Sequence, residues 1–166
     1  AQREECARRT TRKKMFSFVS SLGQVVAPTG AREQIIEAIR LKREKRAVYL
    51  AELYDLGDLE NENSSLGLPV LHAACAQDLG EVVTALVEKR GSNVEARLME
   101  AGPKALAGDA PLHVCARAGA RRAAAALLRL GASMDAGNAE GLDVQSVATR
   151  YLLGSASTDL RALVEE

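Results

Sequence analysis

The chain has 166 residues, of which 47% are apolar and 3% aromatic, with no tryptophan and a formal net charge of zero. This length suits one ordinary domain or one short array of repeats, and Ala- and Leu-rich helices favour thin stacked layers over the bulkier core of a compact enzyme. The absence of an 18-residue apolar run predicts no membrane span, and three cysteines without a C-x-x-C pair favour a reducing compartment, with the cytoplasm preferred over a cytoskeletal, ciliary or organellar assembly.

Charge is unevenly distributed along the chain. Residues 1–50 carry 12 Lys/Arg and 5 Asp/Glu, a net +7, whereas residues 51–166 carry 10 and 17, a net −7. Residues 1–30 have no sustained periodicity, and we interpret them as an extended basic arm, with a mitochondrial presequence disfavoured by Glu4 and Glu5. Its cations are Arg3, Arg8, Arg9, Arg12, Lys13 and Lys14. The first residue is Ala1 rather than Met, which leaves processing and excision from a longer chain both open.

The basic arm has three interpretations. It could contact an acidic protein surface or an import receptor, it could contact RNA, or it could be a solvated tail. A segment with so little apolar surface to bury is disordered by itself, so we expect a neighbouring molecule to order it.

Residues 31–67 follow the arm and have helical periodicity up to Leu56. Thr29 is a plausible N-cap for a helix that starts near Ala31. The pattern allows one long helix or two helices broken near residues 42–46, followed by a loop at residues 61–67. A second cationic stretch at residues 40–46 is interpreted as a charged helix face.

Two later segments, residues 68–91 and 108–131, share one plan. Each begins a short helix with Leu-His, continues with small residues, and adds a second apolar helix that ends on glycine. Such self-similarity indicates stacked repeats. The expected helices are residues 70–77 and 81–89 in the first segment, and 111–118 and 121–130 in the second. Pro111 suits a first helical turn, and Gly119 and Gly131 suit left-handed helix ends.

The second copy, GDAPLHVCA at residues 108–116, resembles the ankyrin repeat, whose motif is Gly-x-Thr-Pro-Leu-His-x-Ala-Ala. The resemblance implies an all-α ankyrin solenoid with repeats at residues 68–107 and 108–140. Residues 31–67 are then an N-terminal helix or degenerate capping repeat, and residues 141–166 a degenerate C-terminal cap. His72 and His113 are 41 residues apart, against about 33 in the family. The excess falls at residues 92–107, in the loop called the finger, and predicts an insertion with a helical turn near residues 95–101.

No residue pattern indicates catalysis, a metal site or a cofactor. The resemblance implies that His72 and His113 bond backbone groups between repeats, and zinc would need further converging ligands. Cys75 and Cys115 are interpreted as small apolar fillers of helix contacts rather than nucleophiles. We therefore expect a protein that is not an enzyme and has no small-molecule substrate.

The resemblance implies a partner surface made of finger tips and the exposed side of each first helix. Exposed leucine, methionine, tyrosine and arginine on such a surface would serve as contacts, although the insertion could instead fold onto its own repeat and bury Leu98 and Met99. The candidate residues are Leu66, Leu68, Ala76, Gln77, Arg97, Leu98, Met99, Lys104, Leu106, Asp109, Arg117, Ala118, Glu140, Leu142, Arg150 and Tyr151.

These inferences give two hypotheses of function. The first is a non-catalytic interaction or scaffold module, a subunit of a larger assembly that binds other proteins through the concave face and the arm. The alternative is a nucleic-acid or ribonucleoprotein component that contacts RNA through residues 3–14, although specific RNA recognition usually adds stacking aromatics.

Overall fold

The structure is a computed structural model that describes residues 30–54, 67–102 and 105–151. This part of the chain contains seven α-helices and no strand, apart from one isolated bridge between Gly102 and Ala105. The helices are α2 (Ala31–Arg40), α3 (Glu44–Leu53), α4 (Val70–Ala76), α5 (Gly80–Arg90), α6 (Pro111–Ala118), α7 (Arg121–Arg129) and α8 (Val144–Tyr151). Within the described residues, no helix is long and apolar enough to cross a membrane.

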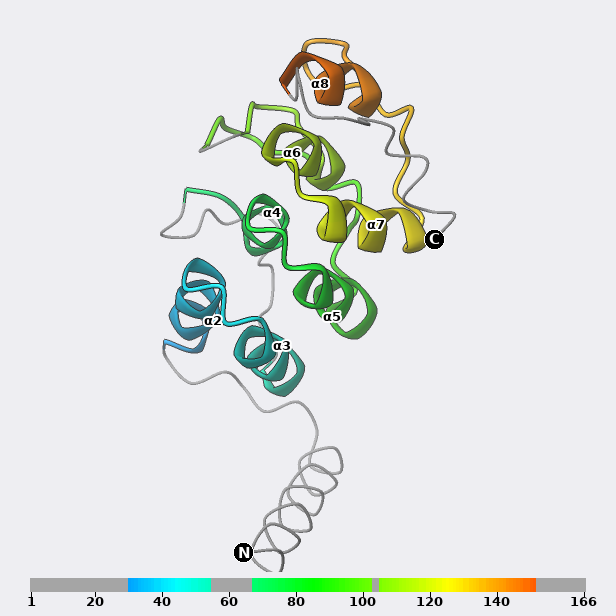
Figure 1. Ribbon diagram of the computed structural model, residues 1–166. Helices are drawn as coiled ribbons and strands as arrows, with labels where there is room; N and C mark the ends of the chain where they lie inside the picture. The colour runs from blue at the N-terminus through cyan, green and yellow to red at the C-terminus, as the bar shows by residue number, and fades with distance from the viewer. Residues whose placement is uncertain (1–29, 55–66, 103–104, 152–166) are drawn as a thin grey trace, which may run out of the picture.

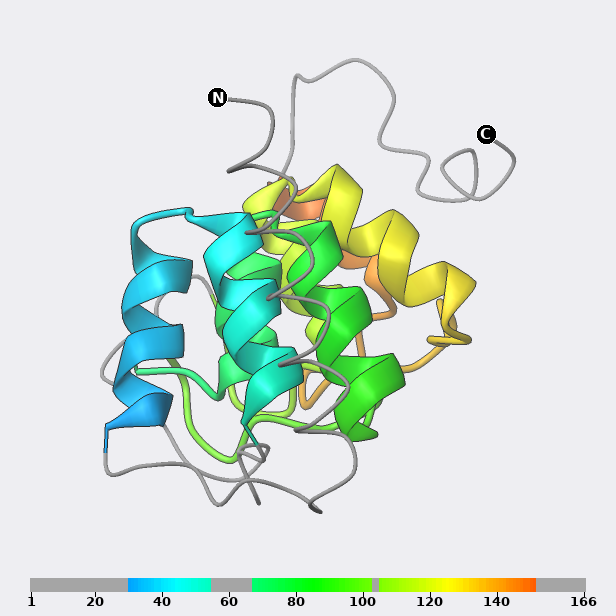
Figure 2. The ribbon, with the colours of Figure 1, turned by 90° about the horizontal axis from the view of Figure 1, so that it is seen from below.

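The helices form two columns. The first helices of successive pairs, α2, α4, α6 and α8, stack in one column, and the second helices, α3, α5 and α7, stack beside it (Figure 1). Seen along the stack, α3, α5 and α7 lie side by side as a layer (Figure 2). The all-α stack of helix pairs predicted from the sequence is therefore present.

The turn inside each pair has one geometry in all three pairs. Its middle residue is left-handed, with φ of 52° at Lys42, 61° at Asp78 and 69° at Gly119. The next N–H closes the turn on a carbonyl five residues back, from Arg43 to Ala38 at 2.8 Å in α2–α3. The same bond closes the α4–α5 turn at 3.1 Å and the α6–α7 turn at 3.0 Å. Residues 31–53 thus share the plan of the later pairs.

Glycine adopts this left-handed conformation without strain, whereas a lysine does not. We therefore expect Lys42→Gly to raise the free energy of unfolding by up to about 1 kcal/mol. Gly119→Ala, the reverse change in the equivalent turn, should lower it by about 1 kcal/mol. Urea denaturation followed by circular dichroism measures both, and a Lys42→Gly variant that unfolds at less urea than the parent contradicts the expectation.

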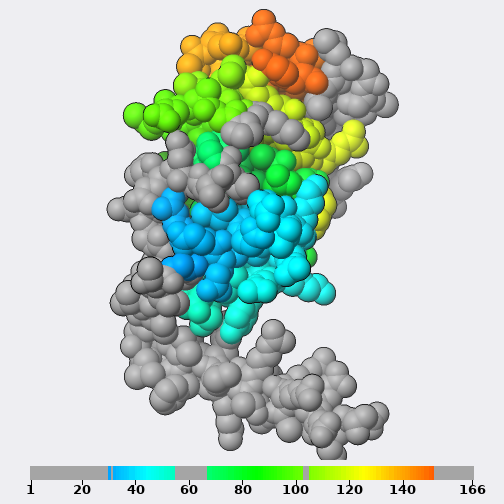
Figure 3. All heavy atoms as spheres, turned by 90° about the vertical axis from the view of Figure 1, so that its left-hand side faces the viewer, coloured from blue at the N-terminus to red at the C-terminus, as the bar shows by residue number. Residues whose placement is uncertain are grey.

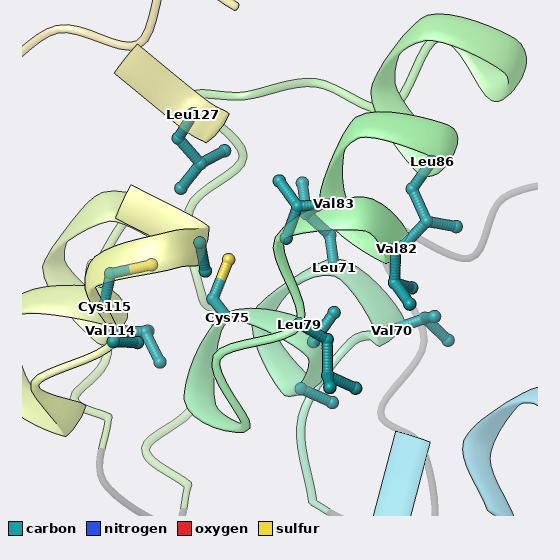
Figure 4. Packing of buried hydrophobic residues seen from close by; sticks show 14 of the residues in the cluster. Val70, Leu71, Cys75, Leu79, Val82, Val83, Leu86, Val114, Cys115 and Leu127 are labelled. Carbon is teal, nitrogen blue, oxygen red and sulfur yellow. The ribbon is translucent and has the colours of Figure 1, made fainter. Parts of the chain in front are cut away.

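Small side chains allow close packing between the columns. The core is rich in alanine, and Cys75 and Cys115 meet inside it, where α4 packs on α6 (Figure 4). Burial, followed by the interaction with Cys75, raises the pKa of the Cys115 thiol well above its ordinary value. Both thiols are buried and free. The interpretation of the two cysteines as apolar fillers agrees with this burial.

The helix boundaries test the sequence patterns. Helix α6 has the predicted bounds, α4 and α7 each end one residue earlier than predicted, and α5 is one residue longer at each end. The periodic segment after Gly30 is two helices rather than one, and its N-cap is Gly30 rather than Thr29. The cationic stretch at residues 40–46 is not one helix face, since it spans the end of α2, the turn and the start of α3.

The insertion lies in the finger between α5 and α6. Leu98 N–H donates to Asp109 O at 3.1 Å, and Gly108 N–H donates to Leu98 O at 2.7 Å, so these bonds close the finger at its base. In the next finger, the equivalent bond joins Asn138 N–H to Leu142 O at 2.9 Å. The extra residues therefore lie between Leu98 and Gly108. The predicted helical turn near residues 95–101 is wrong, because this segment contains no helix and is irregular apart from a turn and a bend.

Candidate interaction surface

A buried carboxylate organises the end of the stack where α6 meets α8. Asp109 is completely buried, and its Oδ2 accepts hydrogen bonds from Arg117 Nε at 2.7 Å and from Leu106 N–H at 2.9 Å. Its Oδ1 accepts one from Asn138 Nδ2 at 2.9 Å. Three donors from the insertion, α6 and the following finger therefore converge on one carboxylate, as a buried charge requires.

Arg117 carries this network to the surface. Its side chain is only 5% exposed, and its guanidinium lies over the Tyr151 ring with its carbon 4.2 Å from the ring centroid. Burial alone would lower the pKa of Arg117, but the hydrogen bond to Asp109 and the interaction with Tyr151 outweigh it and raise that pKa. Tyr151 remains 48% exposed. The buried ion pair thus holds an exposed aromatic ring in a defined orientation.

The two histidines connect successive repeats. His113 Nδ1 accepts from Ala110 N–H at 3.3 Å, which leaves Nε2 to donate to Leu142 O at 3.2 Å. His72 Nε2 lies 3.0 Å from Ala96 O, in the next finger. The predicted structural role of both histidines, which is to bond backbone groups between repeats, is confirmed.

His72 differs from His113 at its other ring nitrogen. The residue equivalent to Ala110 is Pro69, which has no N–H to donate. His72 Nδ1 is accordingly buried without a hydrogen-bond partner in the described part of the chain. Burial lowers the pKa of His72 to about 4, against the smaller opposing effects of the Ala96 and Asp109 backbones and the Asp109 charge. Burial also lowers the pKa of His113.

Three of the predicted partner contacts lie in the interior, which corrects the sequence interpretation. Leu68 is 2% exposed, because the insertion folds back until Gly102 packs against it; a Cβ on Gly102 would lie 2.6 Å from Leu68 Cδ2. Leu98 is 4% exposed because it closes the base of the finger, and Asp109 is the buried carboxylate described above. Arg117 was predicted to contact a partner directly, but its side chain is almost buried and instead supports the exposed ring of Tyr151.

Other candidate residues remain accessible. Met99, directly after the finger base, is 87% exposed, as expected for a partner contact, so the alternative in which the insertion buries both Leu98 and Met99 holds for Leu98 alone. Arg97 is exposed, and its Nη1 joins neighbouring fingers by donating to Gly108 O at 3.0 Å and Gly137 O at 2.5 Å. The exposed or half-buried remainder is Ala76, Gln77, Leu106, Ala118, Glu140, Leu142, Arg150 and Tyr151.

Part of the predicted surface cannot be placed. Leu66, Lys104 and all six cations of the basic arm lie outside the described residues. Among the residues that are placed, α8 brings Arg150 to 3.5 Å from Glu140, and both side chains are about half exposed. The exposed surface around Tyr151 therefore combines an aromatic ring with a weakly paired charge of each sign.

Sequence reasoning missed two residues that connect successive repeats, Asn138 near α8 and Glu44 at the start of α3. Asn138 Oδ1 accepts from Glu140 N–H at 2.9 Å and Leu142 N–H at 3.0 Å, while its amide donates to Asp109. Glu44 accepts from Glu81 N–H at 3.0 Å and from Arg122 at 2.9 Å, and so connects three pairs. An asparagine between glycines could have indicated the first, but no local signal indicates a contact 78 residues away.

The side-chain chemistry of this surface is suited to recognition. In the described ranges, no group of three or more His, Cys, Asp or Glu side chains could hold a metal ion. His72 and Cys75, three residues apart, are both buried. What the surface offers is an oriented aromatic ring, exposed apolar side chains and hydrogen-bonding groups, which are typical of protein interfaces.

These features define a helical repeat protein, in which each helix pair contacts its neighbours in a linear stack. The family model for the ankyrin repeat matches residues 107–139, which comprise α6, α7 and parts of the adjoining fingers. The chain therefore contains an ankyrin repeat at residues 107–139, and the resemblance noted in the sequence is confirmed there. Ankyrin repeats are generally protein–protein interaction modules. No curated protein matches the chain.

Proposed function

We propose that the chain is a non-catalytic scaffold module that holds a partner protein within a larger assembly, in the cytoplasm. The partner binds the concave surface that contains Met99, Leu106, Arg150 and Tyr151, with the basic arm as a second contact. The supporting observation is Tyr151: its ring is half exposed, and a buried ion pair beneath it fixes its orientation. A rigid aromatic anchor contributes strongly to binding, because little conformational entropy is lost when it is covered.

Partner recovery tests this function. Full-length protein and a Met99→Ser/Tyr151→Ala variant would be crosslinked in native extract, and the recovered partners identified by mass spectrometry. We expect the variant to lose about tenfold in affinity for the principal partner, a typical effect of removing an aromatic anchor. Tyr49→Ala is the matched control, since Tyr49 lies on α3 with a similar exposure of 41%. Equal recovery by both variants contradicts the proposal.

The nucleic-acid alternative predicts a different dependence on salt. Contacts between the basic arm and phosphates would weaken by orders of magnitude between about 50 and 200 mM salt, whereas a contact through Tyr151 and Met99 would change little. Replacing Arg8, Arg9 and Arg12 with Gln distinguishes the two. Loss of partner recovery in this arm variant alone, together with sensitivity to ribonuclease, favours the alternative.

A further inference from the structure

Four cations gather at the turn between α2 and α3, at the N-terminal end of the stack. Lys42, Arg43, Lys45 and Arg46 are all exposed, and none forms an ion pair with another described residue. We name these four residues the basic turn. Arg40, just before them, differs because its guanidinium is paired with Glu37 at 2.7 Å. Atoms of α2 and α3, blue and cyan in Figure 3, lie on the face turned to the viewer.

The acid inside this stretch does not neutralise it. The Glu44 side chain is only 17% exposed and is turned along the stack, where it binds Arg122 at 2.9 Å and accepts the Glu81 N–H at 3.0 Å. Glu81, on the flank of the surface, lies near Arg122, whose pKa is raised mainly by Glu44 and to a lesser degree by Asp78 and Glu81. Glu44 and Glu81 are thus engaged with Arg122, and Glu37, which also interacts electrostatically with Arg43, is paired with Arg40. The basic turn therefore keeps most of its charge.

Comparison with the later pairs shows that two of these cations, Arg43 and Arg46, replace core residues. The shared turn geometry aligns Arg43 with Leu79 and Ala120, and it aligns Arg46 with Val82. Leu79, Val82 and Ala120 are at most 4% exposed, whereas Arg43 and Arg46 are exposed. A polar outer face on a terminal repeat keeps the end of an array in water. A mixture of positive and negative side chains would also keep this face in water, and without repulsion among four cations. The need for a solvated end therefore does not explain why all four charges are positive.

The start of α3 adds hydrogen-bond donors beside the basic turn. Two later second helices each receive a carboxylate from the preceding pair: Glu44 accepts the Glu81 N–H in α5, and Asp78 accepts the Ala123 N–H in α7 at 3.0 Å. At the start of α3, by contrast, no carboxylate of residues 30–54, 67–102 or 105–151 accepts from the first N–H groups, and the N-cap Arg43 makes no side-chain cap bond. A carboxylate brought by another molecule would meet open N–H groups at the positive end of the helix dipole as well as the four cations.

We propose that the basic turn is a docking surface for an acidic, carboxylate-rich segment of a partner protein. It is separate from the concave surface around Tyr151, so the module would hold two partners or two parts of one. Charge complementarity and the uncapped start of α3 identify the occupant. RNA fits less well, because sequence-tolerant binding of single strands relies on several stacking aromatics, and the described residues near the turn present one exposed ring, Tyr49.

Peptide binding tests this surface. The probe is a fluorescein-labelled glutamate-rich peptide, with a glutamine-rich peptide of equal length as the neutral control. We expect Lys45→Gln/Arg46→Gln in the full chain to weaken binding of the acidic peptide by about fivefold, given the usual contribution of exposed charges. The matched control is Lys89→Gln/Arg129→Gln, which removes the same charge from exposed positions on α5 and α7 and should change affinity less than about twofold. Equal effects of the two double variants overturn the proposal.

Hydrogen exchange locates the contact in the unaltered protein. The acidic peptide should slow amide exchange within residues 41–47, and slowing confined to other segments overturns the proposal even if the variants fold poorly. An oligouridylate that binds the same residues more tightly than the peptide makes the surface a nucleic-acid site and also overturns it. Tyr151→Ala should change the affinity for the acidic peptide by less than about twofold. The test of the basic turn is therefore independent of the test of the concave surface.

Discussion

Replacing Asp109 with alanine is expected to lower the free energy of unfolding by about 3–5 kcal/mol. The reason is that Arg117, with a side chain 5% exposed, would then be a buried cation without its counter-charge, and the donors from Leu106 and Asn138 would lose their acceptor. Urea denaturation measures the change. Tyr151 should also lose its fixed orientation, which would appear as broadened resonances of its ring.

Two comparisons isolate the buried pair. Glu140→Ala breaks the exposed pair with Arg150 and should change the free energy of unfolding by about 0.5 kcal/mol or less. The double variant Asp109→Leu/Arg117→Ala copies Leu68 and Ala76, the equivalent residues of the preceding repeat. It should be less destabilised than Asp109→Ala, since removing both charges leaves neither one buried alone. A double variant as unstable as the single one would show that packing, rather than the unpaired charge, dominates.

Acidification is expected to destabilise the fold through His72. Its pKa is about 4 in the folded protein and about 6.5 in an unfolded chain. The unfolded state therefore takes up a proton as the pH falls below about 6.5, while the folded state remains neutral until about pH 4. Stability is independent of this group above pH 6.5, and about 3 kcal/mol is lost once the pH is below 4.

A variant separates His72 from the carboxylates that titrate in the same range. His72→Gln removes the titrating ring, so the difference in stability between parent and variant should shrink as the pH falls from 7 to 4. His113 acts in the same direction and remains in both proteins. A difference that is constant over this range would show that His72 is protonated equally in the folded and unfolded states.

The helix pairs could be predicted because local signals specify them. Pro111 begins α6, the left-handed Gly119 ends it, and the apolar spacing fixes which side packs. The sequence pattern did not decide between one helix and two at α2–α3, because the left-handed position that ends α2 is occupied by Lys42. Such a position is usually occupied by glycine, which is the residue that allows it to be predicted. That position is specified by its equivalence with Asp78 and Gly119 rather than by its own side chain.

The surface was harder to predict than the fold. Alignment to the ankyrin motif places a residue on a finger or a helix, but it does not say what the insertion covers. Leu68 is buried because Gly102 closes over it, and Asp109 is buried because Arg117, Leu106 and Asn138 converge on it. Gly102, Leu106 and Asn138 lie in irregular loops, for which periodicity gives no information. Tyr151, on a regular helix, remained exposed.

Because Cys75 and Cys115 are in contact between α4 and α6, their reactivity can be used to measure how often adjacent repeats separate. Cys75 and Cys115 are 0% and 1% exposed, so a thiol reagent reaches neither until the two helices part. The rate at which these two thiols are labelled therefore depends on how often the adjacent repeats separate. Circular dichroism does not detect this separation while the helices stay intact. Occupied and empty forms of the module could be ranked by this rate, which would reveal whether a bound partner tightens the array far from where it binds.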